Sequence, residues 1–299
     1  MNEEMMTMGM GRFVSPKARA EFDAVYRVGM ASLPQPAATH DVPTQFGTVR
    51  VYRFGSTDTV PIVLLPGRAG TTVMWQPNIA GLATHHPVYT IEPLGEAGCS
   101  EQAAPLRDGA DQAAWLSETL AGLSLDRVHL VGHSFGGWLA ANLAVRDARR
   151  LASLSLLDPV HTLGRFPAQL LVRSALATLP LVSRWGRPAF LAWINGGRAV
   201  SPDDPVAAVV DAGMRTYRIA APVPEYLTDD HLRSIDIPAL VVVAGRSVIH
   251  HPQPAYDRAR TLIPHCRAEL WPAATHSLPA ESPHEVDGRL LSFLTEARA

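Results

Sequence analysis

Short runs of consecutive apolar residues recur along most of this chain, and helix-length stretches separate them. The runs are Ile62 to Leu65, Val88 to Ile91, Val128 to Val131, Leu151 to Leu157, Ala239 to Ala244 and Ala268 to Trp271. Strands without alternation are buried on both faces, as in a parallel sheet covered by helices. Helical stretches include Gly109 to Gly122 and a last one from about Glu285 to Ala297. The pattern therefore predicts an α/β fold with a mostly parallel sheet flanked by helices.

The chain before the first of these runs has a different pattern. Up to about Met30 it indicates a surface helix behind a methionine-rich tip, and a proline-containing loop follows. Residues 39–54 alternate on either side of Phe46-Gly47, which predicts a hairpin. We therefore assign residues 1–38 to an N-terminal helix and linker.

One interval, residues 160–233, breaks the alternation of strands and helices. It contains no good strand and is far longer than an ordinary connection. Its large apolar residues are Phe166, Leu170, Leu171, Leu176, Leu179, Trp185, Phe190 and Trp193. We interpret the interval as a helical lid inserted after the strand ending near Leu157, with both tryptophans lining a substrate pocket. The alternative is a pair of extra helices on the sheet edge. Residues 39–159 and 234–299 then form the core.

Composition narrows the classes of protein. The chain has 299 residues, 47% of them hydrophobic, and a net charge of -2. It can bury a large core, and it lacks the positive charge that marks nucleic-acid binding. No apolar run reaches the roughly 20 residues of a membrane span. Cys99 and Cys266 form neither a disulfide framework nor a metal cluster, and the acidic N-terminus does not resemble a signal sequence. These features predict a cytoplasmic protein.

The strongest chemical signal is the segment Val131-Gly132-His133-Ser134-Phe135-Gly136-Gly137, which contains G-x-S-x-G. It follows an apolar run and opens a helix, and a strand, a tight turn and a helix make up the nucleophile elbow. Ser134 would then present its hydroxyl above the sheet at a helix N-terminus. The amide of Phe135 would point at a developing oxyanion. A glycine-rich turn with a capping serine is the alternative.

With this segment in place, the chain resembles the α/β-hydrolase superfamily, and more narrowly its lidded bacterial carboxylesterases. The resemblance runs from Thr39 to the C-terminus. Further segments that carry it are Val63-Leu64-Leu65-Pro66-Gly67-Arg68, Glu92-Pro93-Leu94-Gly95 with Gly98-Cys99-Ser100, and His276 with Glu281 and Pro283. The resemblance implies an acyl-enzyme on Ser134, with no cofactor and no metal. His276 lies where the family places its general base.

The resemblance also implies a second oxyanion donor, the backbone amide of the residue after Gly67, which is Arg68. Pro66 departs from the family, which usually has histidine before that glycine. A backbone amide donates whatever its side chain, so Arg68 can still serve. Its unusual side chain either reaches an anionic substrate group or turns to solvent.

The acid is the second departure from the family. The family commonly has G-x-x-D-x-x-x-P after the penultimate strand, and here Val248 occupies the acid position. The strand that starts at Leu151 ends in Leu157-Asp158-Pro159 and should lie beside the nucleophile strand. A carboxylate at its carboxyl end points into the same crevice. Asp158 is therefore the candidate acid; a capping role for Asp158 beside a Ser-His dyad is the alternative.

We predict no catalytic role for several other histidines and carboxylates near the site. Adjacent histidines do not generally converge on one metal, so His250 and His251 are taken as loop residues. His133 is expected to pack in the elbow. We expect Glu281 to be directed away from His276 and Asp257 to face outward.

The predicted function is hydrolysis of a carboxylic ester that has a small-to-medium hydrophobic group. Thioesterase, lactonase, carbon–carbon hydrolase and acyltransferase chemistry stay open because they share the triad. The competing class is a catalytically weak or inactive ligand-binding protein, favoured by Val248 and Pro66 but opposed by Ser134 and His276. A cofactor-free oxygenase or perhydrolase is a third interpretation. The predicted partner is a small-molecule ester; the oligomeric state stays open, and a homodimer is allowed.

Overall fold

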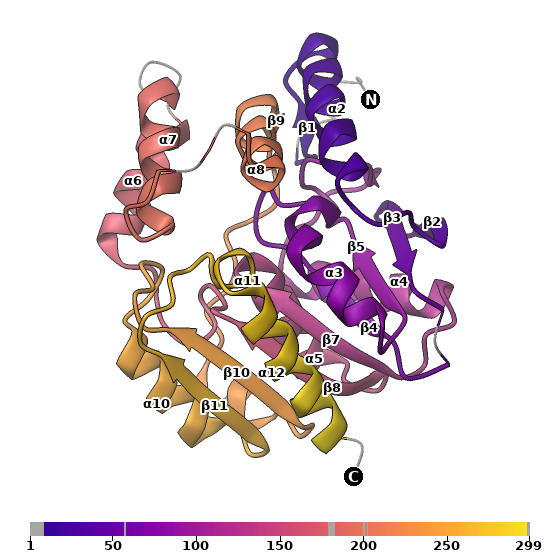
Figure 1. Cartoon of the computed structure of the whole chain (residues 1–299), viewed down its shortest axis with the longest axis vertical. Coiled ribbons are helices and arrows are strands. Elements are labelled where there is room, and N and C mark those ends of the chain that lie inside the picture. Colours follow the sequence, from indigo (N-terminus) through magenta and orange to yellow (C-terminus); the bar gives the residue numbers. More distant parts are fainter. Residues whose placement is uncertain (1–8, 57, 179–182, 200, 202, 298–299) are drawn as a thin grey trace.

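A single nine-stranded sheet forms the centre of the protein (Figure 1). The computed structural model describes residues 9–56, 58–178, 183–199, 201 and 203–297. The strand order is β11-β10-β8-β7-β4-β5-β3-β2, with β6 paired to β3. The strands are β2 (Ala38–Thr44), β3 (Gly47–Phe54), β4 (Ile62–Leu65), β5 (Val88–Ile91), β6 (Glu101–Gln102), β7 (Val128–His133), β8 (Leu151–Leu157), β10 (Ala239–Ala244) and β11 (Cys266–Trp271). Strands β11 to β5 are parallel, and β3, β2 and β6 pair antiparallel.

Helices cover both faces of this sheet. One face packs against α4 (Gly109–Gly122), α5 (Phe135–Arg146) and α10 (Pro252–Leu262). The other packs against α3 (Gln76–Ala83), which follows the 3-10 turn η1 (Thr72–Trp75), and against α11 (Leu278–Glu281) and α12 (Pro283–Glu296). Every side chain of β4 and β10 is buried. Burial on both faces explains why these strands are apolar without alternation.

The predicted α/β fold with a mostly parallel sheet is confirmed. Strand β8 lies between β7 and β10, which places the ends of these three strands together. The hairpin forms from β2 and β3, and the N-terminal helix is α2 (Pro16–Ala31). The methionine-rich tip lies outside the described residues. Within the described part of the chain, no helix is both long enough and apolar enough to cross a bilayer.

The interval after β8 is mainly helical. It contains α6 (Ala168–Thr178), α7 (Ser183–Ile194), α8 (Pro205–Thr216) and α9 (Asp229–Arg233). In Figure 1, α6, α7 and α8 lie beyond the upper edge of the sheet. The interval also contains a strand that the sequence did not predict, β9 (Tyr217–Arg218), which pairs antiparallel with β1 (Arg12–Phe13). A strand of two residues is too short to leave a periodic pattern in the sequence. Leu179 lies outside the described residues.

Candidate active site

Ser134 occupies a sharp turn between β7 and α5. Its backbone has a φ of 55° and a ψ of -117°, a strained conformation that costs roughly 1–3 kcal/mol in a residue other than glycine. Glycines make the turn feasible. A Cβ on Gly132 would lie 2.1 Å from the Gly136 carbonyl oxygen, and a Cβ on Gly136 would lie 2.2 Å from the Leu65 oxygen. The turn holds the Ser134 hydroxyl at the carboxyl end of the sheet.

The structure brings Ser134, His276 and Asp158 into one chain of contacts. His276 Nε2 lies 2.9 Å from Ser134 Oγ, and His276 Nδ1 lies 2.6 Å from Asp158 Oδ2. Ser134 follows β7, Asp158 follows β8, and His276 lies between β11 and α11. All three side chains are buried. Because the carboxyl ends of parallel strands meet at one edge of a sheet, residues far apart in sequence converge there.

The Asp158 carboxylate is fully buried among donors. Oδ1 accepts the backbone N–H of Ala244 at 3.1 Å, and Oδ2 accepts the Ser247 hydroxyl at 2.6 Å. His250 Nε2 lies 3.0 Å from Oδ1. Burial alone would raise the pKa of Asp158, but the contacts with His250 and His276 outweigh burial and hold that pKa well below its usual range. The carboxylate is therefore ionised at neutral pH.

His133 packs against the ring of His276, with the ring centroids 4.8 Å apart. Its Nε2–H donates to the backbone carbonyl of His276 at 2.7 Å. Burial, together with the charge of His276, lowers the pKa of His133 to about 3, so this ring is neutral at neutral pH. The hydrogen bond holds the backbone that carries His276, a packing role of the kind expected from the sequence.

The two expected oxyanion donors belong to residues that line the same cavity as Ser134, namely Phe135 and Arg68. The amides on either side of Arg68 are engaged. The Gly67 amide donates to a methionine sulfur at 3.1 Å, and the Ala69 amide donates to a buried carboxylate at 3.1 Å. Among the described residues, the amides of Arg68 and Phe135 have no such acceptor. They are available to a negatively charged oxygen.

The Arg68 side chain is held by the protein itself. Its Nη1 lies 3.1 Å from Oε1 of Glu96, and its guanidinium lies 4.2 Å from the centroid of the Phe135 ring. Burial raises the pKa of Glu96, and the charge of Arg68 opposes that rise. The Arg68 side chain is therefore partnered within the protein, while it stays 36% exposed and lines the cavity beside Ser134.

Two side chains near the site have roles that sequence reasoning missed. His250 lies in a loop, as predicted, but it is 2% exposed and faces Asp158. Glu281 does not bind His276, but its carboxylate accepts the N–H and the hydroxyl of Thr275 at 2.9 and 2.8 Å, which anchors the loop of His276. The signal for His250 was its position, two residues after Val248, where the family has its acid.

A cavity of about 1040 Å³ extends from Ser134 and His276 to the helices that follow β8. Its apolar lining from α6, α7 and the loop before them includes Phe166, Leu170, Leu171, Phe190, Leu191 and Ile194. The prediction that both tryptophans line this cavity is wrong. Trp185 is 63% exposed, and Trp193 packs against the guanidinium of Arg173. The cavity face of α7 repeats at spacings of three and four residues, and these tryptophans fall outside it.

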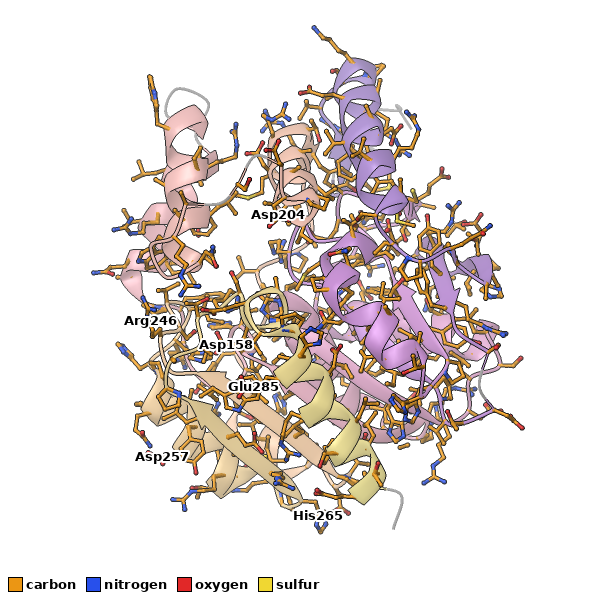
Figure 2. All side chains as sticks on the ribbon, viewed as in Figure 1. Asp158, Asp204, Arg246, Asp257, His265 and Glu285 are labelled. Atoms are coloured by element: carbon orange, nitrogen blue, oxygen red, sulfur yellow. The ribbon has the colours of Figure 1, made fainter. Side chains whose placement is uncertain are left out.

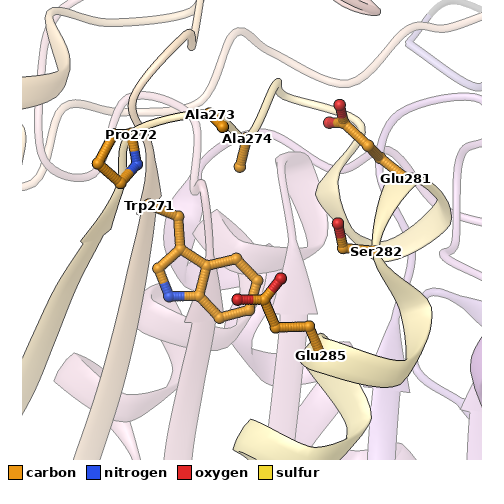
Figure 3. A pocket seen from close by; sticks show the side chains of 7 residues that line it. All are labelled: Trp271, Pro272, Ala273, Ala274, Glu281, Ser282 and Glu285. Carbon is orange, nitrogen blue, oxygen red and sulfur yellow. The ribbon is translucent and has the colours of Figure 1, made fainter.

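Carboxylates near the site differ in where they point. Figure 2 shows Asp158 at the upper end of the strands, while Asp257 lies on the outer side of α10, exposed as expected. A smaller pocket of about 230 Å³ lies outside the His276 loop, between Trp271, Glu281 and Glu285 (Figure 3). No group of three or more His, Cys, Asp and Glu side chains among the described residues is placed to hold a metal ion.

Comparison with known proteins agrees with this fold. A family model for the alpha/beta hydrolase family matches residues 62–289, so the chain belongs to that family. It is 27% identical over 290 residues to carboxylesterase YbfK of Bacillus subtilis, covering 95% of this chain and 96% of that protein. It is 28% identical over 274 residues to the uncharacterized carboxylesterase nap of the same organism, covering 90% of each.

Solved structures show the same likeness. The crystal structure of carboxylesterase CesB (YbfK) from Bacillus subtilis has a TM-score of 0.85 at 27% identity and covers 93% of this chain and 98% of its own. The crystal structure of naproxen esterase from the same organism has a TM-score of 0.86 at 26% identity and covers 95% and 100%. These similarities extend across nearly the whole chain.

Proposed function

We propose that this protein is a serine carboxylesterase that hydrolyses esters with a hydrophobic acyl or alkoxy group through an acyl-enzyme on Ser134. The observation that carries the proposal is the chain of contacts from Ser134 through His276 to Asp158, at 2.9 and 2.6 Å. The similarity to carboxylesterases over most of the chain supports it. The chemistry needs neither metal nor cofactor, because acyl transfer proceeds through the serine oxygen.

In this mechanism His276 takes the proton of Ser134 through Nε2 as the hydroxyl attacks the ester carbon. The ionised Asp158 holds the Nδ1 proton and stabilises the imidazolium that forms. The amides of Phe135 and Arg68 donate to the oxyanion of the tetrahedral intermediate. His276 then returns the proton to the leaving alkoxide, and water repeats the sequence to release the acid.

We propose residues 160–233 as a lid over residues 39–159 and 234–299, the hydrolase core. The cavity that contains Ser134 and His276 is lined on its other side by α6, α7 and α8. A lining of this size and largely apolar character suits a bulky apolar group. Three of the arginines that line it, Arg68, Arg187 and Arg215, are paired with carboxylates of the protein. Hydrophobic lining with few polar groups is typical of small-molecule sites.

The proposed partner is therefore a small-molecule ester, with no nucleic acid, in the cytoplasm. The near-neutral net charge supports a protein that does not bind nucleic acid. The free thiols of Cys99 and Cys266 support a reducing compartment.

A panel of p-nitrophenyl esters of increasing acyl length tests the proposal. We expect turnover that rises with chain length to a medium-length optimum and is abolished in Ser134→Ala. Equal panels of thioesters and lactones would rank the related chemistries. Saturable binding of the esters without release of p-nitrophenol would contradict catalysis and favour the ligand-binding class.

A further inference from the structure

His250 is a fully buried histidine to which the mechanism above gives no role. Its side chain and that of Asp158 both have 0% exposure, and Nε2 lies 3.0 Å from Oδ1. Neither ring nitrogen of His250 has an aligned hydrogen-bond partner among the described residues, so the contact is electrostatic. Burying the polar ring of an imidazole costs free energy unless a polar partner compensates it. The carboxylate of Asp158 is that partner.

The four groups around Asp158 divide evenly between its two oxygens. Oδ2 contacts Ser247 and His276, both at 2.6 Å. Oδ1 contacts the Ala244 amide at 3.1 Å and His250 at 3.0 Å. A carboxylate held at both oxygens cannot rotate, and the oxygen on His276 stays directed at Nδ1. His250 is the only side chain among the described residues that holds Oδ1.

The need for such an anchor follows from the position of the acid. Asp158 has a φ of 45°, a left-handed conformation that is strained for aspartate. Its short side chain must reach His276 from β8. Meanwhile the loop after β10, where Val248 occupies the usual acid position, supplies Ser247 and His250. In the family this loop usually supplies the acid. Here it supplies instead two side chains that contact the Asp158 carboxylate.

We infer that His250 is a positioning residue of the reaction, which holds Oδ1 of Asp158 so that Oδ2 faces His276 throughout proton transfer. The inference rests on the proposed function for the identity of the reaction. The contact of His250 with Oδ1 also offsets part of the negative charge of Asp158, and it therefore weakens the stabilisation of protonated His276 by that charge. The other titratable group coupled to this set is His133, which packs on His276. Removal of His250 should therefore strengthen proton binding at His276.

Three variants test the inference: His250→Phe, His250→Gln and the control His251→Gln, whose side chain is exposed next to His250. We expect His250→Phe to lower kcat about tenfold with KM within about twofold, as for the loss of a side chain that orients a reacting group. The acid limb of its kcat/KM profile should move about half a pH unit higher. His250→Gln, whose amide can donate to Oδ1, should recover part of kcat. His251→Gln should match the parent.

A double-mutant cycle separates positioning from general structure. If His250 acts through Asp158, adding His250→Phe to Asp158→Asn should change kcat by less than about twofold. A full further loss in that background would contradict the inference. So would an unchanged kcat and pH profile in folded His250→Phe.

A measurement that needs no substrate tests the role of His250 independently of the proposed function. The downfield proton resonance of the His276 Nδ1–H reports its hydrogen bond to Asp158. The midpoint of its pH titration should move higher in His250→Phe and by less in His250→Gln. An unchanged resonance and midpoint in His250→Phe would overturn the role of His250. Absence of ester turnover in the parent would instead overturn the proposed function.

Discussion

The carboxylate of Asp158 lies 2.6 Å from Nδ1 of His276, although 118 positions separate the two residues in sequence. They meet because β8, which ends before Asp158, lies between the strand of the elbow and β10. An ionised oxygen at this distance determines which nitrogen of His276 carries the proton, and leaves Nε2 to accept from Ser134. We therefore propose that Asp158 takes the place of the acid that the family usually has at the position of Val248.

Asp158→Asn removes the charge while it keeps the shape of the side chain. We expect kcat to fall at least about a hundredfold, a conservative floor against the roughly 10⁴ lost in a Ser-His-Asp site. The folded state should persist, which thermal melting checks. A fall of less than about threefold would exclude Asp158 from the mechanism and leave a Ser-His dyad or another acid.

Val248→Asp, added to Asp158→Asn, should restore part of the lost activity. Ser247, the residue before Val248, contacts the Asp158 oxygen that faces His276, at 2.6 Å. We therefore expect a carboxylate at position 248 to approach the imidazole of His276. The matched control is Val248→Asn in the same background, which adds the shape without the charge. Equal activity of the aspartate and asparagine variants would show that this position no longer reaches His276.

The sequence was informative where one physical requirement determined the residues. Burial on both faces makes β4 and β10 apolar throughout, and the turn at Ser134 requires glycines where a Cβ would collide. The sequence said less where tertiary contacts decide. His250 and His251 are identical and adjacent, yet one is buried on Asp158 and the other is exposed, and local pattern does not distinguish them.

The same limit applied to the cavity lining. Hydrophobic size drew attention to Trp185 and Trp193, but the orientation of α7 decides which side chains face Ser134. The lining residues of α7 are those on its inner face, such as Phe190.

Phe190→Ala should change chain-length preference, because the lost ring enlarges the cavity. We expect the ratio of kcat/KM for long over short p-nitrophenyl esters to rise at least about fivefold, within the range that methylene-sized differences produce. Trp185→Ala is the matched control, because this aromatic side chain is 63% exposed outside the cavity. An equal change of the ratio in both variants would contradict the assigned lining.

Acid should weaken the protein partly through His133. Its pKa of about 3 in the folded protein lies below the ordinary 6.5, so below pH 6.5 the unfolded chain binds a proton that the folded one does not. This stabilisation is present above pH 6.5 and is lost as pH falls toward 3. His133→Gln keeps an N–H donor but does not titrate. Between pH 7 and 5, urea denaturation should show a fall in unfolding free energy about 2 kcal/mol smaller in the variant. Equal falls would contradict the assignment.

Covalent labelling by a p-nitrophenyl phosphonate, followed by peptide mass spectrometry, shows directly whether Ser134 is the nucleophile. We predict one phosphonyl group on Ser134, release of one equivalent of p-nitrophenol, and loss of both in Ser134→Ala. His276→Ala should slow labelling strongly, and adding it to Ser134→Ala should cost little further esterase activity. Labelling at another residue with Ser134 unmodified, or full esterase turnover in Ser134→Ala, would exclude Ser134 as the nucleophile.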